Sequence, residues 1–173
     1  MQRLSLPPVC IGIAVLIGTI GPVSPSWAVS AFVLWVTDGD TVTVVDQNFH
    51  LQRVRVYGID CPESEQAYGF TARLKTAWEV WLRPVTLLPV ERDRYNRLVA
   101  RVQKESRELS AALLAAGLAW VYDQYCDQDI CRTWKTLEYR ARNQDRGLWI
   151  EPDPIPPWKW RRGERSKRGW RWW

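Results

Sequence analysis

Three short segments of the sequence combine acidic residues with arginines. They are Asp38-Gly39-Asp40-Thr41, residues 55–63, and Asp93-Arg94-Tyr95-Asn96-Arg97. The chain contains one histidine, His50, which leaves little for a Ser-His-Asp or Cys-His arrangement or for a multi-histidine metal centre. Any hydrolysis by this chain would therefore use carboxylates and guanidinium groups.

Taken singly, each segment has a simpler structural explanation. Asp-Gly is a common hairpin turn, and Glu63 would favour the positive end of a following helix. Arg55 shares one face of a predicted strand with Arg53 and Tyr57, because alternate residues of a strand point the same way. Alternation alone does not separate an active arginine from an exposed one.

Taken together and in order, the segments resemble the staphylococcal nuclease (thermonuclease) family. The matching motifs are DGDT at 38–41, R-x-x-x-x-D-x-P-E at 55–63 and D-R-Y-x-R at 93–97. The resemblance continues through Gly117-Leu118-Ala119 to Trp149 and leaves out the C-terminal tail. Three ordered motifs are a far stronger signal than any one of them.

The resemblance implies a role for each matching residue. The residues implied to hold calcium are Asp40, Asp60 and the backbone carbonyl of Cys61. The residues implied to be catalytic are Arg55 and Arg97, which clamp the scissile phosphate, and Glu63, which activates or orients water. The residues implied to contact substrate are Arg94, Tyr95 and Tyr122, with packing as the alternative role for the tyrosines.

General chemistry agrees with these implied roles. Calcium takes oxygen ligands in a variable shell, and two carboxylates plus a carbonyl leave room for water and a phosphate oxygen. Guanidinium groups match phosphate oxygens and stabilise the charge of the transition state. Two departures remove no catalytic group: Cys61 replaces the family's usual threonine, and Asn96 stands where glycine is common but tolerates positive φ.

The motifs need a scaffold, and the hydrophobic periodicity predicts one. Strand patterns cover 31–36, 41–45, 51–57, 85–90 and 98–103, and helical patterns cover 67–82, 109–116 and 130–143. Gly117 stands where a glycine ends the second helix. We expect an α+β, mainly β fold: a five-stranded OB-type Greek-key barrel with about three packed helices.

The length of 173 residues suits one domain, which we place at 29–150. Residues 1–28 have the order of a signal peptide: Arg3, an apolar run at 9–23, and Ser26-Trp27-Ala28 before the cleavage point. The alternative is a retained N-terminal membrane anchor. Cleavage near Ala28 would export the protein to the periplasm or the outside of the cell.

Cleavage would leave three cysteines, Cys61, Cys126 and Cys131. Cys126 and Cys131 flank a short polar loop and are the natural disulfide pair in an oxidising compartment. The alternative is that these two cysteines supply half of the ligands of a metal site, although zinc needs about four ligands.

The net charge of +5 is concentrated in the tail. Residues 29–157 have a net charge of −2, whereas residues 158–173 carry +6 and five tryptophans. The Pro-rich stretch 151–157 predicts a stiff linker that is incompatible with a helix. The tail could bind nucleic acid by charge and stacking, lie at an anionic membrane or envelope surface, or be a disordered solubilising tail.

The resemblance implies an exported, calcium-dependent endonuclease that hydrolyses DNA and RNA with low base specificity and leaves 3′-phosphate ends. We expect a monomer, and the sequence indicates no protein partner. One alternative is a non-catalytic OB-fold module that binds nucleic acid. The other is an envelope-associated protein that functions through its tail.

Overall fold

The computed structural model describes residues 28–164, so the predicted signal peptide and tail residues 165–173 lie outside the described part. Its strands are β1 (Val29–Asp38), β2 (Thr41–Asp46), β3 (Leu51–Val56), β4 (Ile59–Asp60), β5 (Pro84–Arg92), β6 (Leu98–Lys104), β7 (Arg107–Glu108) and β8 (Trp120–Val121). Its helices are α1 (Gly69–Val80), α2 (Leu109–Ala115), α3 (Ile130–Asn143) and α4 (Pro157–Trp160), with 3₁₀ turns at Asp123–Tyr125 and Gly147–Ile150. No helix within residues 28–164 is long and apolar enough to cross a bilayer.

The five long strands close into a barrel. Antiparallel pairing gives the order β3-β2-β1-β5-β6, and a parallel pairing between β3 and β6 closes the ring. Alternating residues of these strands, among them Val33, Val44, Val54 and Val102, are fully buried and fill the interior because successive strand residues point to opposite faces. The structure confirms the predicted OB-type α+β fold.

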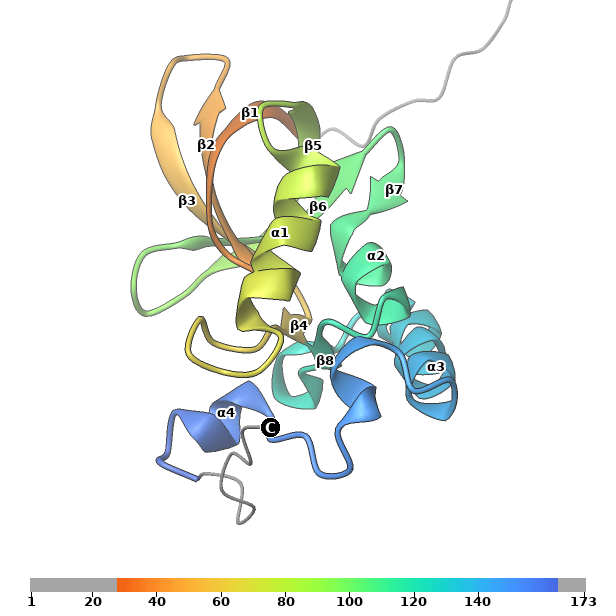
Figure 1. Ribbon diagram of the computed structural model, residues 1–173. Helices are drawn as coiled ribbons and strands as arrows, with labels where there is room; N and C mark the ends of the chain where they lie inside the picture. The colour runs from red at the N-terminus through yellow and green to blue at the C-terminus, as the bar shows by residue number, and fades with distance from the viewer. Residues whose placement is uncertain (1–27, 165–173) are drawn as a thin grey trace, which may run out of the picture.

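The helices cover one side and one end of the barrel (Figure 1). Helix α1 is shorter than predicted because Tyr68 has a left-handed backbone before its start and Trp81 is extended after its end. Helix α2 also ends one residue early, followed by Gly117 at φ 68, and the Leu118 N–H donates to the carbonyl of Leu113. Helix α3 has the predicted bounds.

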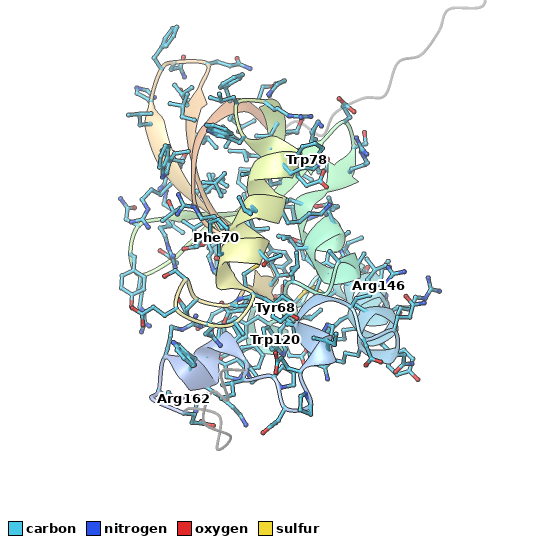
Figure 2. All side chains as sticks on the ribbon, in the orientation of Figure 1. Tyr68, Phe70, Trp78, Trp120, Arg146 and Arg162 are labelled. Atoms are coloured by element: carbon cyan, nitrogen blue, oxygen red, sulfur yellow. A yellow bond between two sulfur atoms is a disulfide. The ribbon has the colours of Figure 1, made fainter. Side chains whose placement is uncertain are left out.

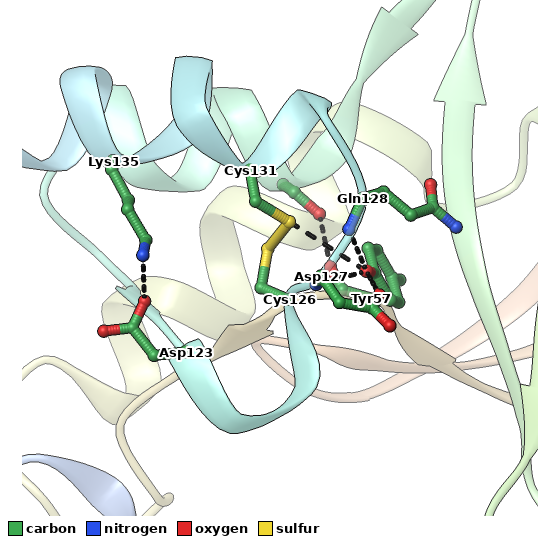
Figure 3. The surroundings of a disulfide bond; sticks show 8 residues. Tyr57, Asp123, Cys126, Asp127, Gln128, Cys131 and Lys135 are labelled. Atoms are coloured by element: carbon green, nitrogen blue, oxygen red, sulfur yellow. Dashed lines mark hydrogen bonds and ion pairs between the residues drawn. A yellow bond between two sulfur atoms is a disulfide. The ribbon is translucent and has the colours of Figure 1, made fainter.

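The loop before α3 is joined to the first turn of that helix by a disulfide and to the barrel by a tyrosine (Figure 3). Cys126 and Cys131 form the disulfide that the sequence suggested. Tyr57 is buried, and its hydroxyl donates to the Asp127 carboxylate while accepting from the Asp127 and Gln128 N–H groups. Alternation predicted that Tyr57 shares a strand face with Arg55, but β3 ends at Val56 and the chain turns at Gly58, so Tyr57 lies beyond the strand.

Residues 151–156 of the predicted linker form no helix, as expected, but its last residue departs from the prediction. Helix α4 begins at Pro157, a position where proline is compatible with a helix because the first N–H has no intrahelical partner. Figure 1 shows α4 below the loop that joins β4 to α1. The Gln66 side chain in that loop donates to the carbonyl of Ile155 at 2.9 Å. We name residues 157–164 the C-terminal strap.

Candidate active site

The turn between β1 and β2 places Asp40 in the interior of the site. The Asp40 N–H donates to the Asp38 carboxylate at 3.2 Å, so Asp38 supports the turn. The Thr76 hydroxyl in α1 donates to the carbonyl of Gly39. A Cβ on Gly39 would lie 2.7 Å from the Cβ of Cys61, so only glycine allows the turn to approach this closely. Asp40 is therefore buried at a fixed position.

Arg55 lies between two buried carboxylates. Its strand position pairs with Thr41, which brings its guanidinium beside the turn that carries Asp40. One guanidinium nitrogen forms an ion pair with Asp40. The other donates to Asp60 at 2.7 Å and to the carbonyl of Ile59 at 3.1 Å. Asp40 and Asp60 therefore converge on one guanidinium, although Asp40 lies in the turn before β2 and Asp60 lies in β4.

Cys61 contributes backbone and packing rather than thiol chemistry. Its N–H donates to Asp40 at 2.7 Å, and its free thiol is buried. Burial raises the pKa of the Cys61 thiol well above its ordinary value, although the charge of Arg55 acts in the opposite direction. The side chain is thus a neutral apolar group, which agrees with an implied role that uses only the backbone.

Glu63 and Asp60 are joined by an arginine that the sequence analysis missed. Arg161 of the C-terminal strap bonds Asp60 Oδ2 at 2.7 Å, Asp60 Oδ1 at 3.3 Å and Glu63 Oε1 at 2.6 Å. Partial burial lowers the pKa of Arg161, but its interactions with Asp60 and, to a smaller extent, Glu63 have a larger effect and raise the pKa overall. We name Asp40, Asp60 and Glu63 the acidic cluster.

Arg97 lies at the rim of the site. It precedes Leu98, which pairs with Val54 in β3, so it begins the strand next to that of Arg55. Its Nε donates to Asp93 at 2.6 Å, and within residues 28–164 no hydrogen bond or ion pair joins it to the acidic cluster. Burial would raise the pKa of Asp93, but hydrogen bonds from the backbone and side chain of Arg97 and the Tyr95 N–H lower it.

The loop between β5 and β6 also carries two of the three predicted substrate contacts, Arg94 and Tyr95. The guanidinium groups of Arg94 and Arg97 lie 5.0 and 5.5 Å from the centre of the Tyr95 ring. Asn96 has φ 60, as expected for an asparagine at a position where the family favours glycine. The loop thus presents two cations around an exposed aromatic ring.

Tyr122 lies on the other side of Asp60 and is covered by the C-terminal strap. Pairing of β4 with β8 places Trp120 beside Asp60, and the Tyr122 N–H donates to the carbonyl of Gly58. The ring of Tyr122 stacks on Trp158, with centroids 5.1 Å apart and planes 7° from parallel. Trp158 also meets the edge of Trp120, whose position is labelled in Figure 2.

The donor chemistry suits a hard cation. The described part of the chain contains no group of three His, Cys, Asp or Glu side chains positioned around a metal. The predicted ligands are two carboxylates and a backbone carbonyl, which are all oxygen donors of the kind calcium prefers. Asp40 and Asp60 already converge on one cation, Arg55, so they can converge on another.

Comparisons with known proteins agree with this arrangement. Residues 53–151 match the family model described as staphylococcal nuclease homologue. An uncharacterized endonuclease of Escherichia coli is 38% identical over 130 residues, covering 75% of this chain and 82% of the relative. The micrococcal nuclease of Shigella flexneri is 34% identical over 152 residues, covering 82% and 86% of the two chains.

A plant relative matches a shorter region. A staphylococcal-like nuclease of Arabidopsis thaliana is 34% identical over 114 residues, which cover 66% of this chain and 34% of that protein. The region matched by the family model contains Arg55, Asp60, Glu63 and Arg97, whereas Asp40 precedes it and Arg161 follows it. This chain belongs to the staphylococcal nuclease family, and its membership supports nuclease activity on nucleic acids.

Proposed function

We propose that this protein is an exported, calcium-dependent nuclease that cleaves DNA and RNA with low base specificity and leaves 3′-phosphate ends. The observation that supports this proposal most directly is the convergence of buried Asp40 and Asp60 on Arg55. That arrangement keeps charged groups inside the protein, which is costly unless they are paired. Their retention in a nuclease-family site favours a role in chemistry.

Asp40, Asp60 and the carbonyl of Cys61 are the proposed calcium ligands. Bound calcium would bridge to the phosphate and neutralise part of its charge. The protein's own contribution is to hold the ligands in place: the Cys61 N–H fixes one oxygen of Asp40, and the Thr41 hydroxyl donates to the other at 3.2 Å. These bonds orient Asp40 before any cation arrives, which lowers the entropic cost of binding.

Arg55, Arg97 and Glu63 are the proposed catalytic residues. Both arginines present several N–H donors in a planar fork, so each can bind two phosphate oxygens. Glu63 lies at the surface of the site, with 37% of its side chain exposed. It can therefore reach a solvent water and accept its proton, whereas the buried aspartates have little access to solvent.

Substrate binding beyond the scissile phosphate is proposed for Arg94, Tyr95 and Tyr122. Tyr95 is exposed and flanked by guanidinium groups, a combination that binds a base by stacking and its phosphate by charge. Stacking on an aromatic ring accepts every base, which agrees with low base specificity. The protein is proposed to act as a monomer.

The proposed activity is tested by digestion of single-stranded DNA and RNA in calcium or in chelator. We expect calcium-dependent cleavage that Glu63→Gln and Arg55→Ala each reduce at least a hundredfold, because each removes a group that acts on the transition state. Matched controls are Glu65→Gln and Arg53→Ala, since Glu65 and Arg53 are exposed neighbours outside the proposed site. Both controls should keep wild-type activity.

Two readouts separate the proposal from its alternatives. Products with 3′-phosphate carry 5′-hydroxyl ends, which polynucleotide kinase labels directly. Binding of DNA without cleavage in calcium would refute the catalytic proposal and favour a nucleic-acid-binding module. Export is tested separately by fractionation and N-terminal sequencing, and a processed chain beginning at Val29 is the expected result.

A further inference from the structure

The C-terminal strap makes contacts with both halves of the proposed site. Trp158 stacks on Tyr122 and meets the edge of Trp120. Three residues further on, Arg161 binds Asp60 and Glu63. The strap therefore covers an aromatic ring proposed to stack on a base and a carboxylate proposed to hold calcium.

Arg161 uses the same oxygens that a cation would need. Asp60 Oδ2 accepts from Arg161 at 2.7 Å. Asp60 Oδ1 accepts from Arg55 at 2.7 Å and from Arg161 at 3.3 Å. Both carboxylate oxygens thus accept hydrogen bonds from guanidinium groups. Because Asp60 is only 1% exposed, an additional ligand cannot approach its carboxylate from the solvent.

A divalent cation on Asp60 would also meet a like charge. A guanidinium and a metal ion bound to the same carboxylate repel each other, and the repulsion is strong in a site with little solvent. Arg55 is held by two aspartates and a carbonyl within the barrel. Arg161 directly follows the four-residue helix α4 and is 44% exposed, so displacing Arg161 costs less free energy than displacing Arg55.

We propose that the C-terminal strap is an internal competitor of metal and substrate: Arg161 occupies Asp60 and Glu63 in place of calcium, and Trp158 occupies the ring of Tyr122 in place of a base. This inference rests on the proposed function. Binding of calcium displaces Arg161, and because Trp158 lies only three residues earlier in the same strap, the displacement weakens the stacking of Trp158 on Tyr122. Calcium and a nucleic-acid base therefore promote each other's binding by expelling one segment.

The proposal is tested by calorimetric titration of calcium chloride into the purified protein and its Arg161→Gln variant. The control is Arg162→Gln, which removes the same charge from the next residue, whose side chain donates to the carbonyl of Trp158 and not to the acidic cluster. We expect Arg161→Gln to bind calcium about fivefold more tightly than the control, a factor equal to about 1 kcal/mol. A partly exposed ion pair is worth about that much.

Trp158→Ala tests the other contact of the same segment. It should also lower the calcium Kd, because the strap loses its aromatic anchor while the acidic cluster is intact. If Arg161→Gln binds calcium no more tightly than Arg162→Gln, or if neither variant binds calcium, the proposed competition is wrong. An unchanged Kd in Trp158→Ala would overturn the coupling between ring and guanidinium.

The titration tests the competition by the strap, and the digestion assay tests the nuclease activity, so their results distinguish the two proposals. If the wild-type protein cleaves DNA in calcium but Arg161→Gln binds calcium no more tightly, the strap proposal is wrong and the nuclease proposal stands. If Arg161→Gln gains calcium affinity but no variant cleaves nucleic acid, the competition stands and the proposed activity is wrong.

Discussion

Replacing Tyr57 by phenylalanine should destabilise the protein by about 2 kcal/mol. The Tyr57 side chain is 3% exposed, and its hydroxyl makes hydrogen bonds of 2.6 Å to the Asp127 carboxylate and 2.9 and 3.1 Å to the N–H groups of Asp127 and Gln128. Each such bond contributes about 1 kcal/mol net. Asp127 is exposed, so in the variant its carboxylate forms hydrogen bonds to water instead. These bonds offset part of the free energy lost with the three hydrogen bonds of the hydroxyl.

The assay is urea unfolding followed by tryptophan fluorescence, with the disulfide intact. For a domain of this size, about 2 kcal/mol corresponds to a Tm lower by about 6 to 8 °C. The control is Tyr139→Phe, because Tyr139 is 64% exposed and surface changes of this kind stay within about 0.5 kcal/mol. A Tyr57→Phe variant as stable as the control would refute the claim that this hydroxyl fixes the loop to the barrel.

The same pair of proteins gives a test at high pH. Burial, and then the hydrogen bond to Asp127, raise the pKa of Tyr57 above its ordinary value near 10.0. The folded state therefore holds the Tyr57 proton more tightly than the unfolded state. This contribution is complete below pH 10 and is lost as the pH rises through the folded pKa, so the stability difference between wild type and Tyr57→Phe should narrow above pH 10.

Three further perturbations follow from the described contacts. Replacing both Cys126 and Cys131 by serine should cost about 2 kcal/mol, the loop-closure value for so short a ring, and reduction of the wild type should match it in the same urea assay. Asn96→Ala should cost about 1 kcal/mol because of its positive φ, whereas Asn96→Gly should change the unfolding free energy by less than about 0.5 kcal/mol; equal losses in both would contradict a backbone cause. Calcium at a hundred times its Kd should raise the free energy of unfolding by about 2.7 kcal/mol, and Asp60→Asn should abolish that rise in a thermal melt.

The barrel and the core of the site could be predicted because they depend on local patterns. Period-two alternation located the five long strands, and the DGDT turn and the stretch 55–63 lie where neighbouring strands meet. The structure brings Asp40, Arg55 and Asp60 into contact. Their assigned roles in metal binding and catalysis stay predictions.

The contacts of the C-terminal strap could not be predicted, because they join residues far apart in sequence. Arg161 reaches Asp60 across 101 positions, and no periodicity or motif records such a pairing. Proline at 157 was interpreted as a helix breaker, although at the first turn it begins α4. The burial of Tyr57 was missed for a related reason, since its partner Asp127 lies 70 positions away.

The closure of the barrel by β3 and β6 has a consequence for the order in which the protein is made. Synthesis proceeds from the N-terminus, and all five long barrel strands are complete at Lys104. The Asp40–Arg55–Asp60 contacts need only residues up to this point, whereas Arg161 follows 57 residues later. The strap is thus synthesised after the residues that make the Asp40–Arg55–Asp60 contacts, so a change confined to residues 157–164 would alter what covers Asp60 without altering any barrel strand.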